Sequence, residues 1–169
     1  MVGHRTRRGA TCRLASICLL AVVLGSGGRG AAAEDGVAPF GDLALRYDPE
    51  VWDVAARPDG FTASCRRPDC RGRLVRGEVL AACEGMGSIR EEGAREPVPA
   101  RWLESRGLSW DVRLWYRGCR NAHPRSIVAC TEAGGRAYRV AARLLDCRTA
   151  PLYGSEERIM DLIRQIGPR

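Results

Sequence analysis

Cysteine is the residue type in this chain with the widest chemistry, because its thiol can form disulfides, bind zinc or act as a nucleophile. Six cysteines lie beyond residue 34: Cys65, Cys70, Cys83, Cys119, Cys130 and Cys147. An even number of cysteines in an exported chain is typical of disulfides. A zinc site would need a second close pair beside Cys65 and Cys70, and the sequence has none. We therefore expect three disulfides and no bound metal or cofactor.

Local geometry favours one set of pairings: Cys65–Cys70, Cys119–Cys147 and Cys83–Cys130. The first pair flanks a short proline-containing turn, which lets the two Cα atoms approach the roughly 5.5 Å that a disulfide requires. The second pair ends the first and third of three predicted strands, whose ends meet at one edge of a sheet. The third pair would then join the middle strand to the earlier half of the chain.

Cys130 is the best candidate for a catalytic nucleophile. The segment VACT at 128–131, with Arg139 downstream and His123 as the single histidine beyond residue 34, is similar to the cysteine, histidine and arginine set of exported sortase-type transpeptidases. However, that family takes its histidine from well upstream, whereas His123 is only seven residues before Cys130. A free thiol would also leave an odd cysteine. A small exported enzyme that uses Cys130 or His123 is therefore the alternative to a non-catalytic protein.

Arginine supplies all 27 of the Lys and Arg side chains, because the sequence has no lysine. Four arginines alternate with apolar residues in predicted strands, so we expect them to share the face opposite the core: Arg113, Arg117, Arg139 and Arg143. A second cluster comes earlier: Arg66, Arg67, Arg71, Arg73 and Arg76. Guanidinium groups bind carboxylates and phosphates through paired hydrogen bonds. The first cluster therefore predicts a site for an anionic ligand or acidic partner; the alternative is that these arginines only solvate the surface.

The stretch 110–147 predicts three antiparallel strands that would carry these four arginines and half of the six cysteines. In the first strand, Val112 and Leu114 alternate with Arg113, and the same period of two recurs in the third. A glycine pair at 134–135 separates the second and third strands, and it supplies the positive φ that a tight hairpin needs.

The remaining segments predict further strands and two helices. Strand patterns cover residues 43–47, 51–54, 61–65 and 74–83, and the polar segment 85–99 predicts a loop. A short helix is expected between Pro99 and Gly107, with Trp102 and Leu103 facing inward. A longer amphipathic helix is expected from Ser155 onward, because its apolar residues follow helical spacing: Ile159, Leu162, Ile163 and Ile166. The predicted class is α+β, an antiparallel sheet with both helices packed on it, stapled by disulfides.

The first 33 residues have the order of a secretory signal peptide. Basic residues at 5, 7, 8 and 13 precede an apolar run at 14–24, and Ala31 and Ala33 form an A-x-A site. We expect cleavage after Ala33 and a periplasmic or secreted protein with no membrane span once the leader is removed. A flexible tail at 34–42 and a single domain at 43–169 would follow.

Export changes the charge balance. The whole chain has 27 arginines and 20 acidic residues, a formal net charge of +7. Five of the arginines and none of the acidic residues precede residue 34, which leaves 22 arginines against 20 acidic residues, or +2. Nucleic-acid binding, which needs a strong basic footprint, is therefore not expected.

Three segments resemble the PsbP/Mog1-like α/β/α sandwich domains: LRYDPEVW at 45–52, GRAY at 135–138 and ERIMDLIR at 157–164. The resemblance covers about residues 43–167, and the six cysteines depart from the usual pattern of these domains. It implies a non-enzymatic binding or assembly role with no catalytic residues. We therefore predict an exported, disulfide-stabilised, non-catalytic domain with an accessory or assembly role in the cell envelope. Such a domain would bind a protein partner or a small anionic ligand.

Overall fold

A computed structural model describes residues 35–70, 73–91, 93–115, 126–143 and 155–169, which all belong to one compact unit, Ala32–Arg169. The predicted leader and its cleavage site lie outside the described residues. So do Arg117, Cys119, His123 and Cys147, and with them the predicted Cys119–Cys147 pairing.

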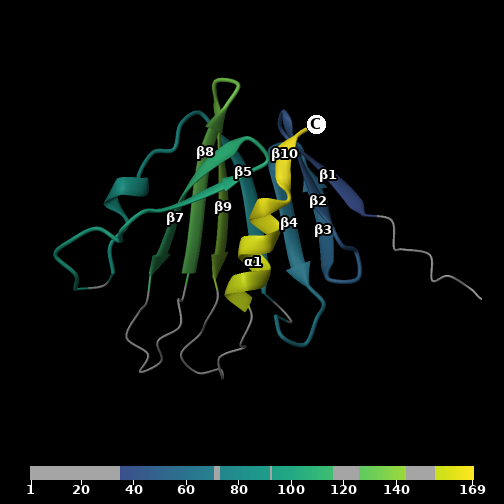
Figure 1. Ribbon diagram of the computed structural model, residues 1–169, viewed down its shortest axis with the longest axis horizontal. Coiled ribbons are helices and arrows are strands. Elements are labelled where there is room, and N and C mark those ends of the chain that lie inside the picture. Colours follow the sequence, from purple (N-terminus) through teal and green to yellow (C-terminus); the bar gives the residue numbers. More distant parts are fainter. Residues whose placement is uncertain (1–34, 71–72, 92, 116–125, 144–154) are drawn as a thin grey trace, which may run out of the picture. The chain divides into compact units, whose positions relative to one another are not determined.

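Most of the described residues form two antiparallel sheets (Figure 1). The larger sheet has seven strands in the order β3-β4-β5-β9-β8-β7-β6. Their bounds are β3 Trp52–Arg57, β4 Gly60–Cys65, β5 Leu74–Leu80, β6 Arg101–Ser105, β7 Leu108–Trp115, β8 Ser126–Ala133 and β9 Arg136–Arg143. Strands β7, β8 and β9 are neighbours, as the 110–147 pattern predicts, and β5 pairs with β9 to join the two halves of the chain.

A smaller sheet and one α-helix form the rest of the described secondary structure, apart from a short 3₁₀ helix, η1 (Met86–Ser88). The smaller sheet has the order β1-β2-β10, with bounds β1 Gly36–Phe40, β2 Leu43–Tyr47 and β10 Ile166–Pro168. The helix α1 (Ser155–Arg164) lies in front of the larger sheet in Figure 1 and leads directly into β10.

Alternation along the strands decides which face of the larger sheet is buried. In β7, Trp110, Val112 and Leu114 are buried, and the register places them in line with the buried residues of β8 and β9. They share one core with the apolar face of α1 and with β1 and β2. We call this face of the larger sheet the inner face, and the opposite face the outer face.

Phe40 at the end of β1 joins the smaller sheet to the larger one. Its ring is fully buried and meets two rings of the larger sheet edge to face, with centroids 5.0 Å from Phe61 and 5.2 Å from Tyr138. Gly77 of β5 leaves room for this cluster, because a Cβ atom there would lie 2.1 Å from the Phe61 ring. The strand register with β4 and β9 is continuous through Gly77, so the residue does not mark a bulge. The close approach of the Phe61 ring explains why a glycine stands at this position.

The predicted α+β class is wrong, because the structure is mostly β with one α-helix among the described residues. The short helix expected between Pro99 and Gly107 is instead β6, which pairs with β7. Arg106 and Gly107 both have positive φ, 48° and 75°, so they form the tight turn of the β6–β7 hairpin rather than a helix end. Trp102 is 67% exposed, so it does not face inward with Leu103.

Two segments near the ends of the chain also differ from expectation. Residues 34–42 were expected to form a flexible tail, but they contain β1, which pairs along its whole length with β2. Ile166 was expected on the apolar face of the helix, but α1 ends at Arg164 and Ile166 begins β10. Ile166 is nevertheless buried, because β10 pairs with β2 beside the core.

Two of the three predicted disulfides are present. Cys65–Cys70 closes the loop after β4, and Cys83–Cys130 ties the β5–β6 connection to β8. The Cα atoms are 5.7 and 5.9 Å apart, respectively. The predicted hairpin turn is also confirmed, since the glycines at 134 and 135 have φ of 59° and 75° between β8 and β9.

The short disulfide loop holds the first turn of α1. The Ser155 hydroxyl donates a hydrogen bond to the Asp69 carbonyl at 3.1 Å, and Arg158 Nε lies 3.0 Å from the Asp69 carboxylate. The hydrogen bond from Arg158 and its positive charge lower the pKa of Asp69 from its ordinary value of 3.8. The Cys65–Cys70 loop therefore fixes the helix through both a backbone and a charged contact.

This arrangement predicts how stability changes with pH. Because the pKa of Asp69 is lower in the folded state, its ion pair stabilises the protein above the unfolded pKa and loses that effect as the pH falls through the folded value. We expect Asp69→Asn to lower the urea midpoint slightly at pH 7, and the difference from the native protein to shrink below about pH 4. A difference that grows on acidification would contradict this assignment.

No helix within the described ranges combines the length and apolar character that crossing a membrane requires.

Candidate functional site

The outer face of the larger sheet carries three of the four arginines that the sequence grouped together, and the fourth, Arg117, lies outside the described residues. The strand register aligns Arg113 of β7 with Val128 of β8 and Ala141 of β9, and it aligns Trp115 with Arg143 one row further along. Arg113, Arg139 and Arg143 therefore share the face opposite the core, as the alternation predicts.

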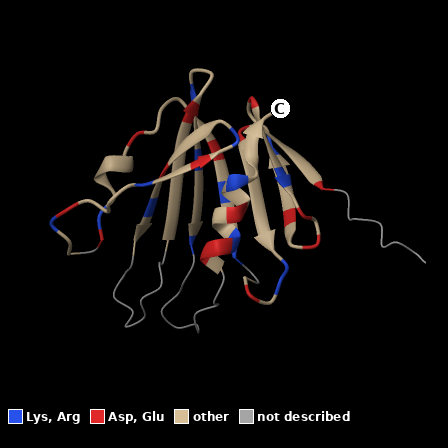
Figure 2. Ribbon diagram, in the orientation of Figure 1, with Lys and Arg blue, Asp and Glu red and all other residues tan. Residues whose placement is uncertain are grey.

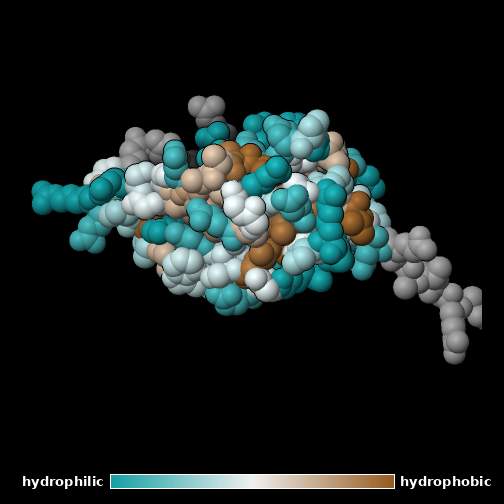
Figure 3. Space-filling model, turned by 90° about the horizontal axis from the view of Figure 1, so that it is seen from above, coloured by the Kyte–Doolittle hydropathy of each residue, from teal (hydrophilic) through white to brown (hydrophobic). Residues whose placement is uncertain are grey.

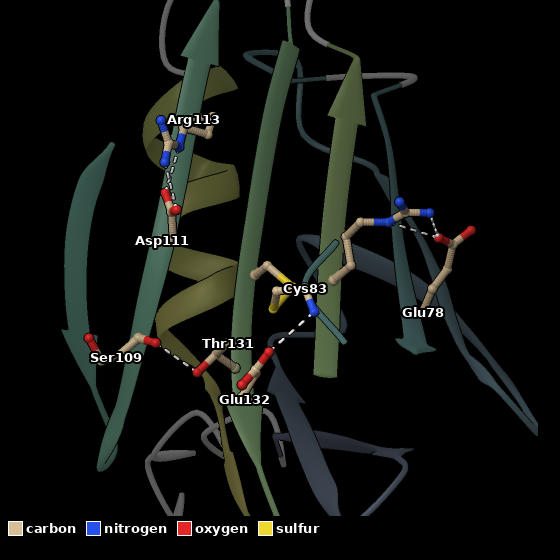
Figure 4. Close-up of a disulfide and its surroundings, with 9 residues drawn as sticks. Glu78, Cys83, Ser109, Asp111, Arg113, Thr131 and Glu132 are labelled. Carbon is tan, nitrogen blue, oxygen red and sulfur yellow. Dashed lines mark hydrogen bonds and ion pairs between the residues drawn. A yellow bond between two sulfur atoms is a disulfide. The ribbon is translucent and has the colours of Figure 1, made fainter. Parts of the chain in front are cut away.

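Two of these arginines are neutralised within the protein. Arg113 Nε and Nη2 lie 2.7 and 2.8 Å from the two carboxylate oxygens of Asp111, and Nη1 donates to the Val98 carbonyl. Arg139 Nε lies 3.2 Å from Glu78 on the neighbouring strand β5. Figure 4 shows Arg113, Asp111 and Glu78 on the side of the sheet away from α1, and Figure 2 shows basic and acidic residues interspersed over the strands. Neither guanidinium is free to bind an external anion without losing an internal partner.

The β5–β6 connection covers part of the outer face. Cys83–Cys130 anchors it, and the Cys83 N–H donates to Glu132 at 3.3 Å (Figure 4). Met86 of this connection packs on Cys130 and Ala137. Seen from above (Figure 3), apolar residues form separate patches within a mostly hydrophilic surface. No residue of the described β5–β6 connection lines the part of the outer face beyond Arg113, toward Trp115 and Arg143.

A groove of about 700 Å³ opens at this part of the sheet, and its lining comes from β5, β9, β8 and β7 and the residue before β5. Its described lining is Arg73, Leu74, Arg76, Trp115, Ser126, Ile127, Val128, Ala141, Ala142 and Arg143. We call this site the arginine groove. Its volume is within the range of small-molecule sites, about 300–1,000 Å³. The described lining supplies positive charge and apolar surface, with Ser126 as its neutral polar side chain.

The three arginines of the groove have no internal acceptor for their charge among the described residues. Arg76 and Arg143 are exposed, and neither forms a hydrogen bond or ion pair with any other described residue. Arg73 Nε is buried without a hydrogen-bond partner, and burial lowers the pKa of this guanidinium from its ordinary value of 12.5. A buried N–H donor that has no acceptor is costly.

The groove joins the two arginine clusters of the sequence. Arg143 comes from the predicted ligand face, whereas Arg73 and Arg76 come from the earlier cluster, and the β5–β9 pairing brings them together. That pairing joins segments about sixty residues apart, so no local pattern predicts it. Arg66 of the earlier cluster lies outside the groove and pairs with Asp53 at 3.2 Å.

The candidate nucleophile is not available for catalysis. Cys130 is buried and bonded to Cys83, so it has no thiol. Its proposed partner His123 lies outside the described residues. Among the described residues, no three His, Cys, Asp or Glu side chains are placed to hold a metal ion.

No family model matches the chain, and no curated protein is similar to it in sequence. Among solved structures, a crystal structure of a protein from Bacteroides thetaiotaomicron, determined at 1.50 Å resolution, aligns with a TM-score of 0.44 and 13% sequence identity. The alignment covers 80% of this chain and 48% of that chain, so this chain spans about half the length of the Bacteroides protein.

Proposed function

We propose that this chain is an exported, non-catalytic binding domain that holds a small anionic ligand in the arginine groove. The observation that carries the proposal is the convergence of Arg73, Arg76 and Arg143 on one concave site whose described lining contains no carboxylate. Each guanidinium there can donate paired hydrogen bonds to a carboxylate, sulfonate or phosphate. The signal-peptide pattern and the two disulfides support export.

The ion pairs of Arg113 and Arg139 narrow the set of residues that can bind the ligand. The sequence alone favoured Arg113, Arg117, Arg139 and Arg143 as the ligand-binding set. Of these, Arg113 and Arg139 already bind Asp111 and Glu78, so the proposal assigns the ligand to Arg143 together with the two arginines near the start of β5. Arg113 and Arg139 then stabilise the sheet instead of contacting the ligand.

Calorimetric titration with benzoate, benzenesulfonate and phenyl phosphate tests this function. We expect at least one of these anions to bind, and Arg76→Gln with Arg143→Gln to weaken that binding by about tenfold or more, because hydrogen bonds to charged groups are lost. Melting should barely change, since exposed substitutions usually shift stability by about 0.5 kcal/mol or less.

The matched control is Arg57→Gln with Arg136→Gln, which removes the same charge from two exposed positions outside the groove. The control should bind as the native protein does. The proposal fails if none of the three anions binds, or if the two double variants weaken binding equally.

A further inference from the structure

The arginine groove is positively charged at one end and apolar along the rest of its length. Arg73 and Arg76 lie at β5 and Arg143 on the neighbouring β9, so positive charge gathers over these two strands. From there the groove continues over β8 and β7, where Val128 and Trp115 line it. A ligand that contacts the whole groove would therefore have its charge at one end.

The dimensions of the sheet set the length of that ligand. Adjacent strands lie about 4.8 Å apart, so the three spacings from β5 to β7 amount to about 14 Å. The path runs across the strands, and two neighbouring register rows line it: Arg76, Ala141 and Val128 in one, and Arg143, Ser126 and Trp115 in the next. An extended alkyl chain of medium length matches a path of this length across the strands better than a compact polyanion does.

Exposed apolar surface in the groove points the same way. Leu74 is 41% exposed, and it is one of three large hydrophobic side chains that are exposed among the described residues. It directly precedes Val75, which pairs with Ala142, the neighbour of Arg143 in the chain. An inorganic anion would cover the arginines and leave Leu74 and Trp115 in water, whereas an apolar chain would cover both.

We propose that the ligand of the arginine groove is a single-chain amphiphile with a carboxylate head, such as a medium-chain fatty acid. Its head group binds Arg73, Arg76 and Arg143, and its chain lies across β9 and β8 toward Trp115. This inference rests on the proposed function and narrows the class of ligand. The Arg73 Nε–H finds its acceptor in the carboxylate, and the paired arginines Arg113 and Arg139 stay outside the site.

Calorimetric titration of the native chain with butanoate, hexanoate, octanoate and decanoate, kept below their micelle concentrations, tests the apolar part of the inference. Burial of one methylene is worth about a fourfold gain in affinity when it is complete, so about two- to fourfold per methylene is expected in an open groove. Decan-1-ol, which lacks the charge, should bind at least tenfold more weakly than decanoate.

Substitutions in the groove separate the head from the chain. Trp115→Ala should weaken decanoate by about tenfold or more and leave butanoate unchanged, whereas Trp102→Ala, at an exposed tryptophan outside the groove, should change neither. If Trp115→Ala does not fold, Leu74→Ala serves in its place, with the same direction and a smaller effect. Arg76→Gln with Arg143→Gln should weaken all four acids.

The outcomes distinguish this inference from the proposed function. Affinity that does not depend on chain length, together with benzoate, benzenesulfonate or phenyl phosphate binding that still requires Arg76 and Arg143, would overturn the amphiphile and leave the anion site intact. Decanoate binding that is indifferent to the arginine variant would overturn both. Binding to phosphatidylglycerol vesicles without any binding of decanoate would identify a membrane surface instead of a free amphiphile, and would also overturn the inference.

Discussion

Replacing Phe40 with alanine is expected to lower the free energy of unfolding by about 3–5 kcal/mol, the usual cost of removing a fully buried aromatic ring. The Phe40 ring is completely buried and packs edge to face on Phe61 and Tyr138. Its loss removes the contact through which β1 is held against the larger sheet. Urea unfolding, followed by tryptophan fluorescence, measures the change.

Val37 on the same strand provides the control, because its side chain is 62% exposed. Val37→Ala should change the free energy of unfolding by about 0.5 kcal/mol or less. The pair of variants also tests the place of residues 34–42 in the fold. If this segment were a flexible tail, both substitutions would be silent, and a Phe40→Ala protein with native stability would contradict the packing of β1.

Removing the Cys83–Cys130 disulfide is expected to lower the free energy of unfolding by about 4 kcal/mol, because the two cysteines are 47 residues apart in sequence and the bond closes a long loop. The bond also holds the β5–β6 connection against the outer face, with Met86 packed beside it. Cys83→Ala with Cys130→Ala should therefore lower the urea midpoint strongly. It should also expose the outer face beneath the connection, which faster amide hydrogen exchange in β8 would show.

The second described disulfide provides the comparison. Cys65–Cys70 spans only five residues, and loop-closure entropy gives it about 2 kcal/mol. Cys65→Ala with Cys70→Ala should accordingly be the milder change. An equal or larger loss in this variant would show that contacts of the short loop with α1, such as the Asp69–Arg158 ion pair, outweigh chain entropy.

Period-two alternation predicted most strands of the larger sheet, because a strand with one buried face has an apolar residue at every second position. The same signal could not recognise β1, whose five residues include Pro39. Proline is tolerated there because β1 is an edge strand of the smaller sheet. The hairpin at 101–112 was missed because Gly107 fits either a helix end or a tight turn, and only the positive φ of Arg106 beside it decides between them.

The candidate site was predictable only in part. Alternation correctly placed Arg113, Arg139 and Arg143 on one face, and the spacing of Asp111 and Arg113 already puts that pair side by side. Glu78 opposite Arg139, in contrast, depends on the β5–β9 pairing, which arises from tertiary structure. The resemblance to PsbP/Mog1-like domains remains a prediction.

The ligand is expected in the arginine groove and not at the paired arginines, Arg113 and Arg139. The most direct test is a two-dimensional ¹H–¹⁵N NMR titration of the protein with benzoate, which locates the bound anion by the amides it shifts. We predict the largest shifts around the start of β5, the end of β9 and Val128 of β8, with little change at Asp111 or Glu78. Shifts centred on Arg113 and Arg139, or on the Cys65–Cys70 loop, would contradict it.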